Sequence, residues 1–244
     1  MTRPVRIHTR QTLQEGTATH LEEQPARHLV KVLRRRIGDP VILFNGNGHE
    51  YVGTITDCRP PDQCTIELTA VSMPAVESPL AITLVQAIGR GERMDWSIQK
   101  ACELGVASIM PVFTERTEVK LTDKRAEKRL AHWQGVAVAA CEQSGRVRVP
   151  QIDAPVQLTA AAFEVSPRYY LDPAAELSPT AVERPDPLEA LIAIGPEGGF
   201  TEHELDWLNR QGFTGLRLGP RVLRTETAGP AAIAVLQSLF GDWR

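Results

Sequence analysis

The sequence has few cysteines, few aromatic residues and no long hydrophobic run. The cysteines form no Cys-x-x-Cys pair and have no histidine at metal-binding spacing; they are Cys58, Cys64, Cys102 and Cys141. This pattern indicates reduced thiols and argues against a metal site. No apolar segment approaches the about 20 residues of a membrane-spanning helix, and the residues after Met1 lack the apolar core of a signal peptide. We therefore expect a cytoplasmic protein that neither spans a membrane nor holds a metal.

The formal net charge of −3 excludes a strongly basic protein, so it gives no overall reason to expect a nucleic-acid partner. The basic residues are nevertheless unevenly distributed, because a group of them crowds into residues 27–36. This group, called the basic stripe below, consists of Arg27, Lys31, Arg34, Arg35 and Arg36. Such a stripe can direct RNA or another phosphate-bearing ligand to one face of the protein, although the same pattern also occurs on an ordinary solvated helix.

The length of 244 residues and the 42% content of hydrophobic residues suit a chain of two domains. We place the first domain at residues 1–72, a proline-containing linker at 73–79 and the second domain at 80–244. In the first domain, Pro25 opens a helical stretch that places Leu29, Val32 and Leu33 on one side at i, i+3, i+4 spacing. Strands are expected at Val41–Phe44, Tyr51–Ile55 and Thr65–Val71, the first two joined by a turn at Asn45–Gly48. Short strands around one helix indicate a small barrel-like module.

Beyond the linker the pattern changes to alternating strands and helices, which is typical of an α/β domain. Strands are expected at Leu80–Ala87, Ile109–Phe113 and Tyr169–Leu171, and a long helix at about Lys124–Gln143. Asp95 can cap a helix that runs to Leu104, and residues 172–187 form a proline-rich surface loop. Pro230 is tolerable only in the first turn of the closing helix, so we place the cap of that helix near Thr227 and leave residues 219–226 as a loop.

Two short apolar runs, Leu191–Ile194 and Leu216–Leu218, each lead into a loop rich in glycine and proline. Between them lies the capping box Thr201-Glu-His-Glu204, which begins a helix that ends at Gly212. The order strand, loop, helix, strand, loop predicts a βαβ unit whose two strands are neighbours. Open α/β sheets bind ligands at the carboxyl edge of their strands, so a ligand site is expected there. The alternative for either loop alone is simple turn chemistry.

The first loop, Gly195-Pro-Glu-Gly-Gly199, has neither the Lys-Ser/Thr pair of a P-loop nor G-x-G-x-x-G spacing. Its glycines instead expose backbone groups that can bind an adenine or ribose edge. Glu197 is either a functional carboxylate or a charge near the start of the next helix. In the second loop, Arg224 and Glu226 could act on a ligand, or could pair with each other and fix the loop.

The end of the long helix reads Cys141-Glu-Gln-Ser-Gly-Arg146, with Gly145 as its C-cap. Glu142 and Arg146 are candidates to project toward a site, and the alternative is ordinary surface polarity. Cys141 is not expected to be a nucleophile, because no histidine lies nearby in the sequence.

Taken in order, these motifs resemble the RsmE family of ribosomal RNA methyltransferases, which belongs to the SPOUT superfamily and modifies N3 of a uridine in 16S rRNA. The resemblance rests on Gly195-Pro-Glu-Gly-Gly199, Leu218-Gly-Pro-Arg-Val-Leu-Arg-Thr-Glu-Thr-Ala228, Glu142-Gln-Ser-Gly-Arg146 and Gln99-Lys-Ala-Cys-Glu-Leu-Gly105. The N-terminal His28-Leu-Val-Lys-Val-Leu-Arg34, Gly38-Asp39 and Phe44-Asn-Gly46 are similar to the PUA-like domain of that family.

The resemblance implies a small N-terminal PUA-like β-barrel domain and a C-terminal α/β domain of the SPOUT type with a trefoil knot. It also implies a homodimer that binds S-adenosyl-L-methionine and needs no metal. The residues that it assigns to the cofactor are Leu171, Gly195, Gly199, Leu218, Gly219, Leu223, Arg224, Thr225, Glu226 and Thr227. The expected partner is 16S ribosomal RNA, within the assembled small subunit, with its backbone held by the basic stripe.

For catalysis we expect positive groups to stabilise the anion that forms when uridine loses its N3 proton. Arg224 and Arg146 are the candidates for this role, and Glu226 or Glu142 for proton acceptor. Two other functions fit parts of the sequence. One is a non-catalytic RNA-binding protein, which cofactor binding would exclude. The other is a nucleotide-binding enzyme of Rossmann type, against which the missing G-x-G-x-x-G motif argues.

Overall fold

The computed structural model describes residues 4–119 and 123–243 and has a mixed α/β fold. The chain forms two compact units. The first comprises the N-terminal part up to Glu77 together with Cys141–Val149, and the second comprises Ser78–Ala140 and the part from Pro150 onward. None of the helices in the described residues is long and apolar enough to cross a membrane.

The first unit is built on a five-stranded sheet with the order β1-β3-β4-β5-β2. Only the β1–β3 pair is parallel, and the other neighbours are antiparallel. The strands are β1 (Val5–His8), β2 (Ala18–His20), β3 (Pro40–Phe44), β4 (Glu50–Arg59) and β5 (Gln63–Ser72). The predicted hairpin is therefore confirmed, and it turns at residues 45–48, where Gly46 and Gly48 have positive φ angles. The buried core of the first unit includes Leu43, Ile66 and Leu68.

The helical stretch of this unit differs from the prediction in its winding. A short helix α1 (Glu23–Arg27) continues as a π-helix, η1 (His28–Val32). A π-helix has a wider turn than an α-helix, so the i, i+3, i+4 rule does not apply to it. Leu29 and Val30 are buried, whereas Val32 is 63% exposed and Leu33 37% exposed. The expected common face of Leu29, Val32 and Leu33 is wrong for this reason.

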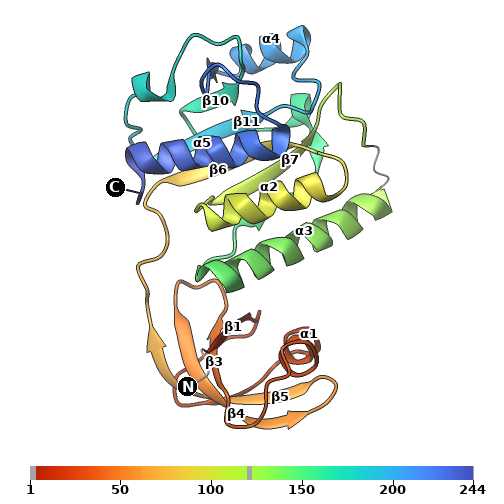
Figure 1. Ribbon diagram of the computed structural model, residues 1–244, viewed down its shortest axis with the longest axis vertical. Coiled ribbons are helices and arrows are strands. Elements are labelled where there is room, and N and C mark those ends of the chain that lie inside the picture. Colours follow the sequence, from red (N-terminus) through yellow and green to blue (C-terminus); the bar gives the residue numbers. More distant parts are fainter. Residues whose placement is uncertain (1–3, 120–122, 244) are drawn as a thin grey trace. The chain divides into compact units, whose positions relative to one another are not determined.

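The second unit contains a parallel sheet with the order β12-β10-β11-β6-β7-β8, and β9 pairs with β7. The strands are β6 (Ala81–Ala87), β7 (Ser108–Phe113), β8 (Gln151–Ile152), β9 (Val156–Gln157), β10 (Arg168–Leu171), β11 (Glu189–Ile194) and β12 (Phe213–Leu216). The helices are α2 (Glu92–Glu103), α3 (Asp123–Ser144), α4 (Glu202–Arg210) and α5 (Thr225–Phe240), with short 3-10 turns η2 (Leu158–Ala160) and η3 (Pro179–Ala181). Helices α2 and α5 pack together, and α5 contacts β6 and β11 (Figure 1).

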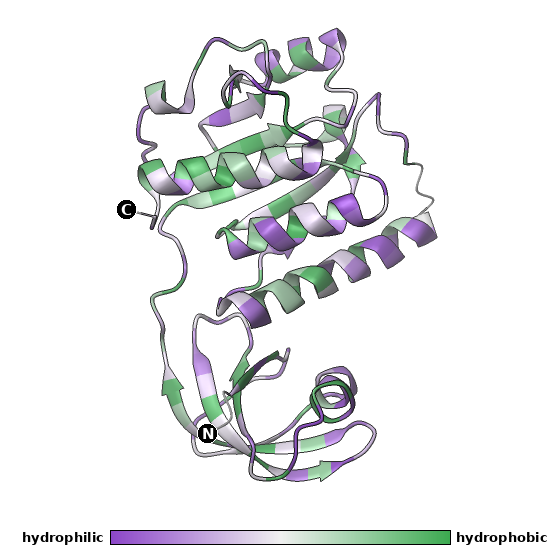
Figure 2. Ribbon diagram, in the orientation of Figure 1, coloured by the Kyte–Doolittle hydropathy of each residue, from purple (hydrophilic) through white to green (hydrophobic). Residues whose placement is uncertain are grey.

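Hydropathy explains why these elements form the centre of the second unit. Strands β6 and β11 and helix α5 are predominantly hydrophobic, whereas α3 carries a polar stretch along its first half (Figure 2). In β11 every residue from Ala190 to Ile194 is buried, as expected for a strand covered on both faces of a parallel sheet. The central strands of the sheet are therefore held in place by apolar burial.

The two strands that flank the capping-box helix are not neighbours, contrary to the prediction. Strand β10 lies between them and pairs in parallel with both: Tyr169 is opposite Ile192 of β11 and Thr214 of β12. The chain order strand, helix, strand does not by itself fix adjacency, because another segment can insert between the two strands. All three strands are parallel, so their carboxyl ends still meet at one edge of the sheet.

Two helices begin earlier than predicted. Helix α2 begins at Glu92 with Gly91 as its N-cap, so Asp95 lies inside the helix and does not cap it. Helix α5 begins at Thr225 with Arg224 as its N-cap, and Pro230 lies inside it. A proline inside a helix removes one backbone hydrogen bond, but this helix is extensively buried and packing outweighs that loss. By contrast, the capping box of α4 is confirmed, with Thr201 as N-cap and both reciprocal hydrogen bonds present.

Candidate active site

A cavity of about 460 Å³ lies at the carboxyl edge of β10, β11 and β12. Its walls come from the residues that end these strands, from the two glycine-rich loops and from the beginning of α5. The lining residues are Arg93, Leu171, Asp172, Pro173, Ile194, Gly195, Pro196, Glu197, Gly199, Phe200, Leu216, Leu218, Gly219, Arg221, Val222, Leu223, Arg224, Thr225, Glu226 and Ala228. The two loops singled out in the sequence therefore share one cavity, although their strands are not adjacent.

Glycine is required in these loops for two different reasons. At Gly195, an added Cβ would lie 3.2 Å from the backbone nitrogen of Phe200, so a side chain would fit only if that backbone shifted by a few tenths of an ångström. Gly199 and Gly219 have φ angles of +70° and +78°, which side chains rarely allow. The tight turns leave backbone groups exposed toward the cavity, next to apolar side chains such as Leu171 and Leu218. Such a wall suits a flat, partly apolar ligand with hydrogen-bonding edges.

A short chain of hydrogen bonds connects the first loop to α5 and to β6. The hydroxyl of Thr225 donates to the carbonyl oxygen of Gly195 over 2.8 Å. The Nε2 of Gln86 donates to the Thr225 hydroxyl over 3.2 Å and to the carbonyl oxygen of Ala87 over 3.1 Å. Both side chains are buried. The sequence reasoning missed Gln86, although a single amide inside the apolar strand at residues 80–87 was a signal that could have been followed.

Four charged side chains meet at the cavity. Arg93 at the beginning of α2 donates from Nη1 to Oε1 of Glu197 over 2.6 Å. The Nε of Arg93 and the Nη1 of Arg224 each lie 4.0 Å from Oε1 of Glu226. The other oxygen of Glu226, Oε2, is buried and has no hydrogen-bond partner among the described residues. The Arg224–Glu226 pair, the alternative to a role of these residues in ligand binding, is therefore only a distant one, and Arg93 was missed because it lies far away in the sequence.

Every residue that the family resemblance assigns to the cofactor lines this cavity except Thr227, which lies in the first turn of α5 but is not part of the wall. Thr225 and Glu226 also belong to that first turn, and not to a loop as expected. Within residues 4–119 and 123–243, no three histidine, cysteine, aspartate or glutamate side chains are grouped so that they could hold a metal ion.

The other two catalytic candidates, Arg146 and Glu142, do not line the cavity and belong to the first unit. Arg146 is 7% exposed and donates from Nε and Nη2 to Oε2 of Glu77, over 3.0 Å and 2.7 Å. Glu142 accepts a hydrogen bond from the backbone N–H of His8 over 2.9 Å. Burial raises the pKa of Glu142, and this effect outweighs the opposing contribution of that hydrogen bond.

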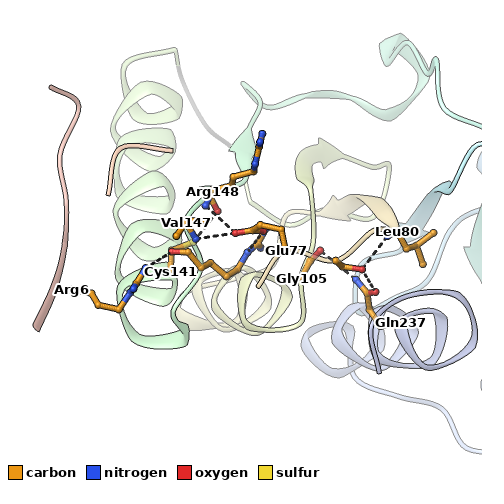
Figure 3. Close-up of polar contacts among 10 residues, drawn as sticks. Arg6, Glu77, Leu80, Gly105, Cys141, Val147, Arg148 and Gln237 are labelled. Atoms are coloured by element: carbon orange, nitrogen blue, oxygen red, sulfur yellow. Dashed lines mark hydrogen bonds and ion pairs between the residues drawn. The ribbon is translucent and has the colours of Figure 1, made fainter. Parts of the chain in front are cut away.

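Glu77 organises the segment that follows α3. Its Oε1 accepts hydrogen bonds from the backbone N–H groups of Val147 and Arg148, each over 3.0 Å, while Oε2 receives the Arg146 guanidinium (Figure 3). Arg6 adds a hydrogen bond from Nη2 to the carbonyl oxygen of Arg146 over 3.1 Å. This carboxylate is therefore a structural anchor for the segment 146–148, which the sequence did not indicate.

The basic stripe runs along α1, η1 and the loop that follows. Arg35 is half-buried and the other four residues are exposed. In the described part of the chain, none of the five forms an ion pair with a carboxylate. Arg34 has a φ angle of 53°, unusual for a residue other than glycine. Arg34, Arg35 and Arg36 also line a shallow cavity of about 480 Å³ together with Val30, Ile37, Cys58 and Pro60.

Two protein-family descriptions match the chain. The family described as "RNA methyltransferase domain" matches residues 76–237, and the one described as "RNA methyltransferase PUA domain" matches residues 21–69. Among curated proteins, the ribosomal RNA small subunit methyltransferase E of Buchnera aphidicola subsp. Schizaphis graminum is 33% identical over 243 residues, which covers 97% of each chain. The protein of the same name from Bacillus subtilis is 30% identical over 240 residues, 93% of each chain.

Solved structures give the same result. A putative methyltransferase from Legionella pneumophila, in complex with the bound cofactor SAM, superimposes with a TM-score of 0.93 at 37% identity. A ribosomal RNA small subunit methyltransferase E from Neisseria gonorrhoeae, bound to S-adenosyl methionine, superimposes with a TM-score of 0.92 at 36% identity. Each alignment covers 99% of this chain and 100% of the other.

Proposed function

The chain belongs to the ribosomal RNA small subunit methyltransferase E (RsmE) family, and from this premise we propose that it transfers a methyl group from S-adenosylmethionine to N3 of a specific uridine in 16S ribosomal RNA. Its family membership makes it an S-adenosylmethionine-dependent methyltransferase of small-subunit ribosomal RNA. The observation that carries the proposal is the cavity at the sheet edge, where the two glycine-rich loops, Arg224 and Glu226 come together.

The residues of the cavity fit the cofactor in shape and in charge. The apolar side chains of Leu171, Leu218 and Leu223 can cover the faces of an adenine ring, while the glycine-rich loops offer backbone groups to its edges. The unpaired Oε2 of Glu226 offers a negative charge to a positively charged ligand. When bound, S-adenosylmethionine supplies a methyl group on a positively charged sulfur, so the leaving group is already activated and no metal is needed.

Arg224 is our candidate for stabilising the uridine anion, because its side chain is 79% exposed and belongs to the cavity wall. A guanidinium there can bind the carbonyl oxygens on which the negative charge develops. Glu226 is the candidate proton acceptor in the same wall. For Arg146 and Glu142 we propose a positioning role, since both side chains are engaged with partners in the first unit.

For the substrate, we propose that the basic stripe binds the phosphate backbone of the ribosomal RNA within the assembled small subunit. Its arginines and its lysine make no ion pair in the described part of the chain, so they are available to phosphates. We accordingly propose an RNA-binding domain at residues 1–72, a linker at 73–79 and a methyltransferase domain at 80–244. A homodimer and a trefoil knot in the second domain, as the family resemblance implies, complete the proposal.

The experiment is to map the methylated positions of 16S rRNA from cells that lack this protein. We expect one N3-methyluridine to be missing, and to return when the intact protein is supplied but not when Arg224→Ala is supplied. The purified protein should methylate small subunits from the deleted cells in vitro and bind S-adenosylmethionine. Unchanged methylation in the deleted cells would refute the proposed substrate, and normal methylation by Arg224→Ala would refute the role of that arginine.

A further inference from the structure

The carboxylate of Glu226 stands in the cavity with one oxygen unsatisfied, and we infer that it recognises the positive charge that distinguishes the methyl donor from its demethylated product. We further assign to Arg93 the role of setting how strongly this carboxylate acts. The inference rests on the proposed function, because it concerns the cofactor of the same cavity. The inference goes beyond the proposed function by naming the residues that favour release of S-adenosylhomocysteine relative to S-adenosylmethionine.

The surroundings of Glu226 leave its charge incompletely neutralised. Its side chain is 16% exposed, and Oε2 is buried without a hydrogen-bond partner among the described residues. The nearest cationic atoms, on Arg93 and Arg224, lie 4.0 Å from Oε1, which is beyond hydrogen-bonding distance. Leaving a buried carboxylate oxygen unsatisfied is unfavourable, so an oxygen left in this state inside a ligand cavity indicates that a ligand group completes it.

Arg93 could neutralise Glu226 but is held by another carboxylate. Its Nη1 donates to Oε1 of Glu197 over 2.6 Å, in the loop that follows β11. The three residues come from three different elements, α2, the first glycine-rich loop and α5, and all three line the cavity. Glu197 therefore engages the Nη1 of Arg93, while the Nε of the same guanidinium stays 4.0 Å from Glu226. Without Glu197, the same guanidinium could turn toward Glu226 and neutralise it.

The two forms of the cofactor differ in the charge that such a carboxylate detects. S-adenosylmethionine carries a sulfonium, an ammonium and a carboxylate, so it has one net positive charge. S-adenosylhomocysteine has lost the sulfonium charge and is neutral overall. An incompletely neutralised carboxylate attracts the first more than the second, because the electrostatic energy depends on the charge of the ligand. The carboxylate therefore shifts the ratio of the two affinities toward the donor.

The structure predicts the direction in which three substitutions change one ratio. This ratio is the dissociation constant of the product, S-adenosylhomocysteine, divided by that of the donor, S-adenosylmethionine. Glu226→Gln removes the charge and should lower this ratio by about tenfold, the effect of one interaction with a charged group. Arg93→Gln removes a competing positive charge and should raise it by about threefold, since the charge is partly exposed and screened. Glu197→Gln releases Arg93 toward Glu226 and should lower it by a similar factor. The double variant Arg93→Gln/Glu197→Gln should lack that decrease.

The test is isothermal titration calorimetry of S-adenosylmethionine and S-adenosylhomocysteine on the whole protein and on each variant. Glu103→Gln and Lys100→Gln are the controls, because they remove one charge of each sign from the same helix as Arg93, where the two side chains form an ion pair with each other and do not line the cavity. Neither should change the ratio. Thermal unfolding of every variant shows whether it is folded, and Glu226→Gln preserves the shape of the side chain.

The outcomes separate the inference from the proposed function. If the unaltered protein binds neither ligand, the proposed function fails and the inference with it. If it binds both, and Glu226→Gln leaves the ratio unchanged, the inference is overturned while the proposed function stands. A Glu226→Gln variant that loses turnover with an unchanged ratio also overturns it, because Glu226 would then act only as a proton acceptor. A decrease with Glu197→Gln that persists in the double variant would overturn the role of Arg93.

Discussion

The hydroxyl of Thr225 donates a hydrogen bond to the carbonyl oxygen of Gly195 over 2.8 Å and so joins the first turn of α5 to the loop after β11. The Nε2 of Gln86 donates a second hydrogen bond to the same hydroxyl and so fixes its position. The strand end, the loop and the helix are thus connected through one buried side chain. Because the Gly195 peptide forms part of the cavity wall, the orientation of that peptide depends on Thr225.

We predict that Thr225→Val weakens the binding of S-adenosylmethionine by about tenfold and destabilises the protein by about 1–3 kcal/mol. Valine keeps the shape of the side chain but leaves the Gly195 carbonyl and the Gln86 amide each without one buried partner. Calorimetry and urea unfolding would measure the two effects. Thr225→Ser retains the hydroxyl and serves as the control, with an affinity close to that of the unaltered protein. Equal affinities of the valine and serine variants would contradict the prediction.

The capping box of α4 gives a second prediction, because its Glu204 has two tasks. This carboxylate is 1% exposed; Oε2 accepts from the backbone N–H of Thr201 over 2.9 Å and Oε1 from that of Glu115 over 2.8 Å. Thr201→Ala should cost about 1 kcal/mol, as usual for an N-cap. Glu204→Ala should cost more, about 2–4 kcal/mol, since two backbone N–H groups lose the buried carboxylate that accepts from them. Urea unfolding measures both.

The exposed Glu202 lies in the same helical turn and provides the control for the capping box. Glu202→Ala should change the free energy of unfolding by less than about 0.5 kcal/mol, because it removes only a solvated charge near the helix start. If Glu204→Ala were no more destabilising than Glu202→Ala, the hydrogen bond from the Glu115 backbone N–H to Glu204 would contribute nothing to the free energy of unfolding.

Features that depend on a few neighbouring residues could be predicted from the sequence. The capping box at Thr201, the glycines that turn the two loops and the hairpin at residues 45–48 all follow from local backbone chemistry. The glycines of the two loops also led us to expect a ligand site at the strand ends where the cavity lies. The family resemblance then assigned cofactor residues that line the cavity, apart from Thr227.

What the sequence could not provide depends on contacts between distant residues. The position of β10 between β11 and β12 is decided by pairing across the sheet, which no local pattern encodes. Arg93 reaches Glu197, 104 residues further along the chain, and nothing in its own surroundings indicates this. The segment after α3 also depends on a distant contact, because Arg146 donates to Glu77, which lies outside every motif. The start of α5 was misplaced for a different reason, since the rule for proline overlooks burial.

The pair of Arg146 and Glu77 provides a third prediction, which separates a structural from a catalytic role. Removing one partner of a buried ion pair leaves an uncompensated charge and typically costs about 3–5 kcal/mol. We therefore expect both Arg146→Ala and Glu77→Ala to destabilise the protein in urea unfolding, and Glu77→Ala by more, because the backbone N–H groups of Val147 and Arg148 also lose their acceptor. For the control we choose Arg90→Ala, whose partner Glu118 is exposed and whose loss should cost less than about 1 kcal/mol.

Methyl transfer by the same variants completes this test. If Arg146 positions its segment together with Glu77, the two alanine variants should lose activity in parallel, each with a lower maximal rate and a higher KM. If Arg146 acts directly on the uridine, Arg146→Ala should lose far more of the maximal rate than Glu77→Ala at a temperature where both are folded. A larger loss of the maximal rate in Arg146→Ala would show that Arg146 is a catalytic residue and not a positioning residue.

The basic stripe supplies a fourth prediction, which concerns salt. Each phosphate contact releases bound counterions, so the logarithm of the affinity falls with the logarithm of salt concentration by about 0.7–0.9 per contact. Arg34→Gln/Arg36→Gln removes two such contacts and should therefore reduce this slope by about 1.4–1.8 and raise KM for small subunits. The affinity for S-adenosylmethionine should not change. Lys124→Gln/Lys128→Gln, on the exposed side of α3, removes the same charge as a control, and an equal effect of both variants would contradict the prediction.

The last prediction concerns pH and rests on Glu142. Burial raises the pKa of this carboxyl in the folded protein, while the backbone N–H of His8 and then His28 and Arg6 act in the opposite direction without cancelling it. A raised pKa means that the folded state holds the proton more tightly than the unfolded state does. The contribution of Glu142 to stability is therefore fully present below its ordinary pKa of about 4.3 and is lost as the pH rises through the raised value.

Glu142→Gln removes this titration but keeps an oxygen that can accept the hydrogen bond from His8, which spans 2.9 Å. Relative to that variant, the unaltered protein should therefore lose free energy of unfolding as the pH rises from the ordinary pKa of about 4.3 toward neutrality. Urea unfolding of both proteins across this range measures the difference, from which the other titrating groups, including His8, largely cancel. If the difference instead grew with pH, the positive charge of Arg6 and the His8 N–H would dominate over burial, and the carboxylate of Glu142 would stabilise the first unit in its charged form.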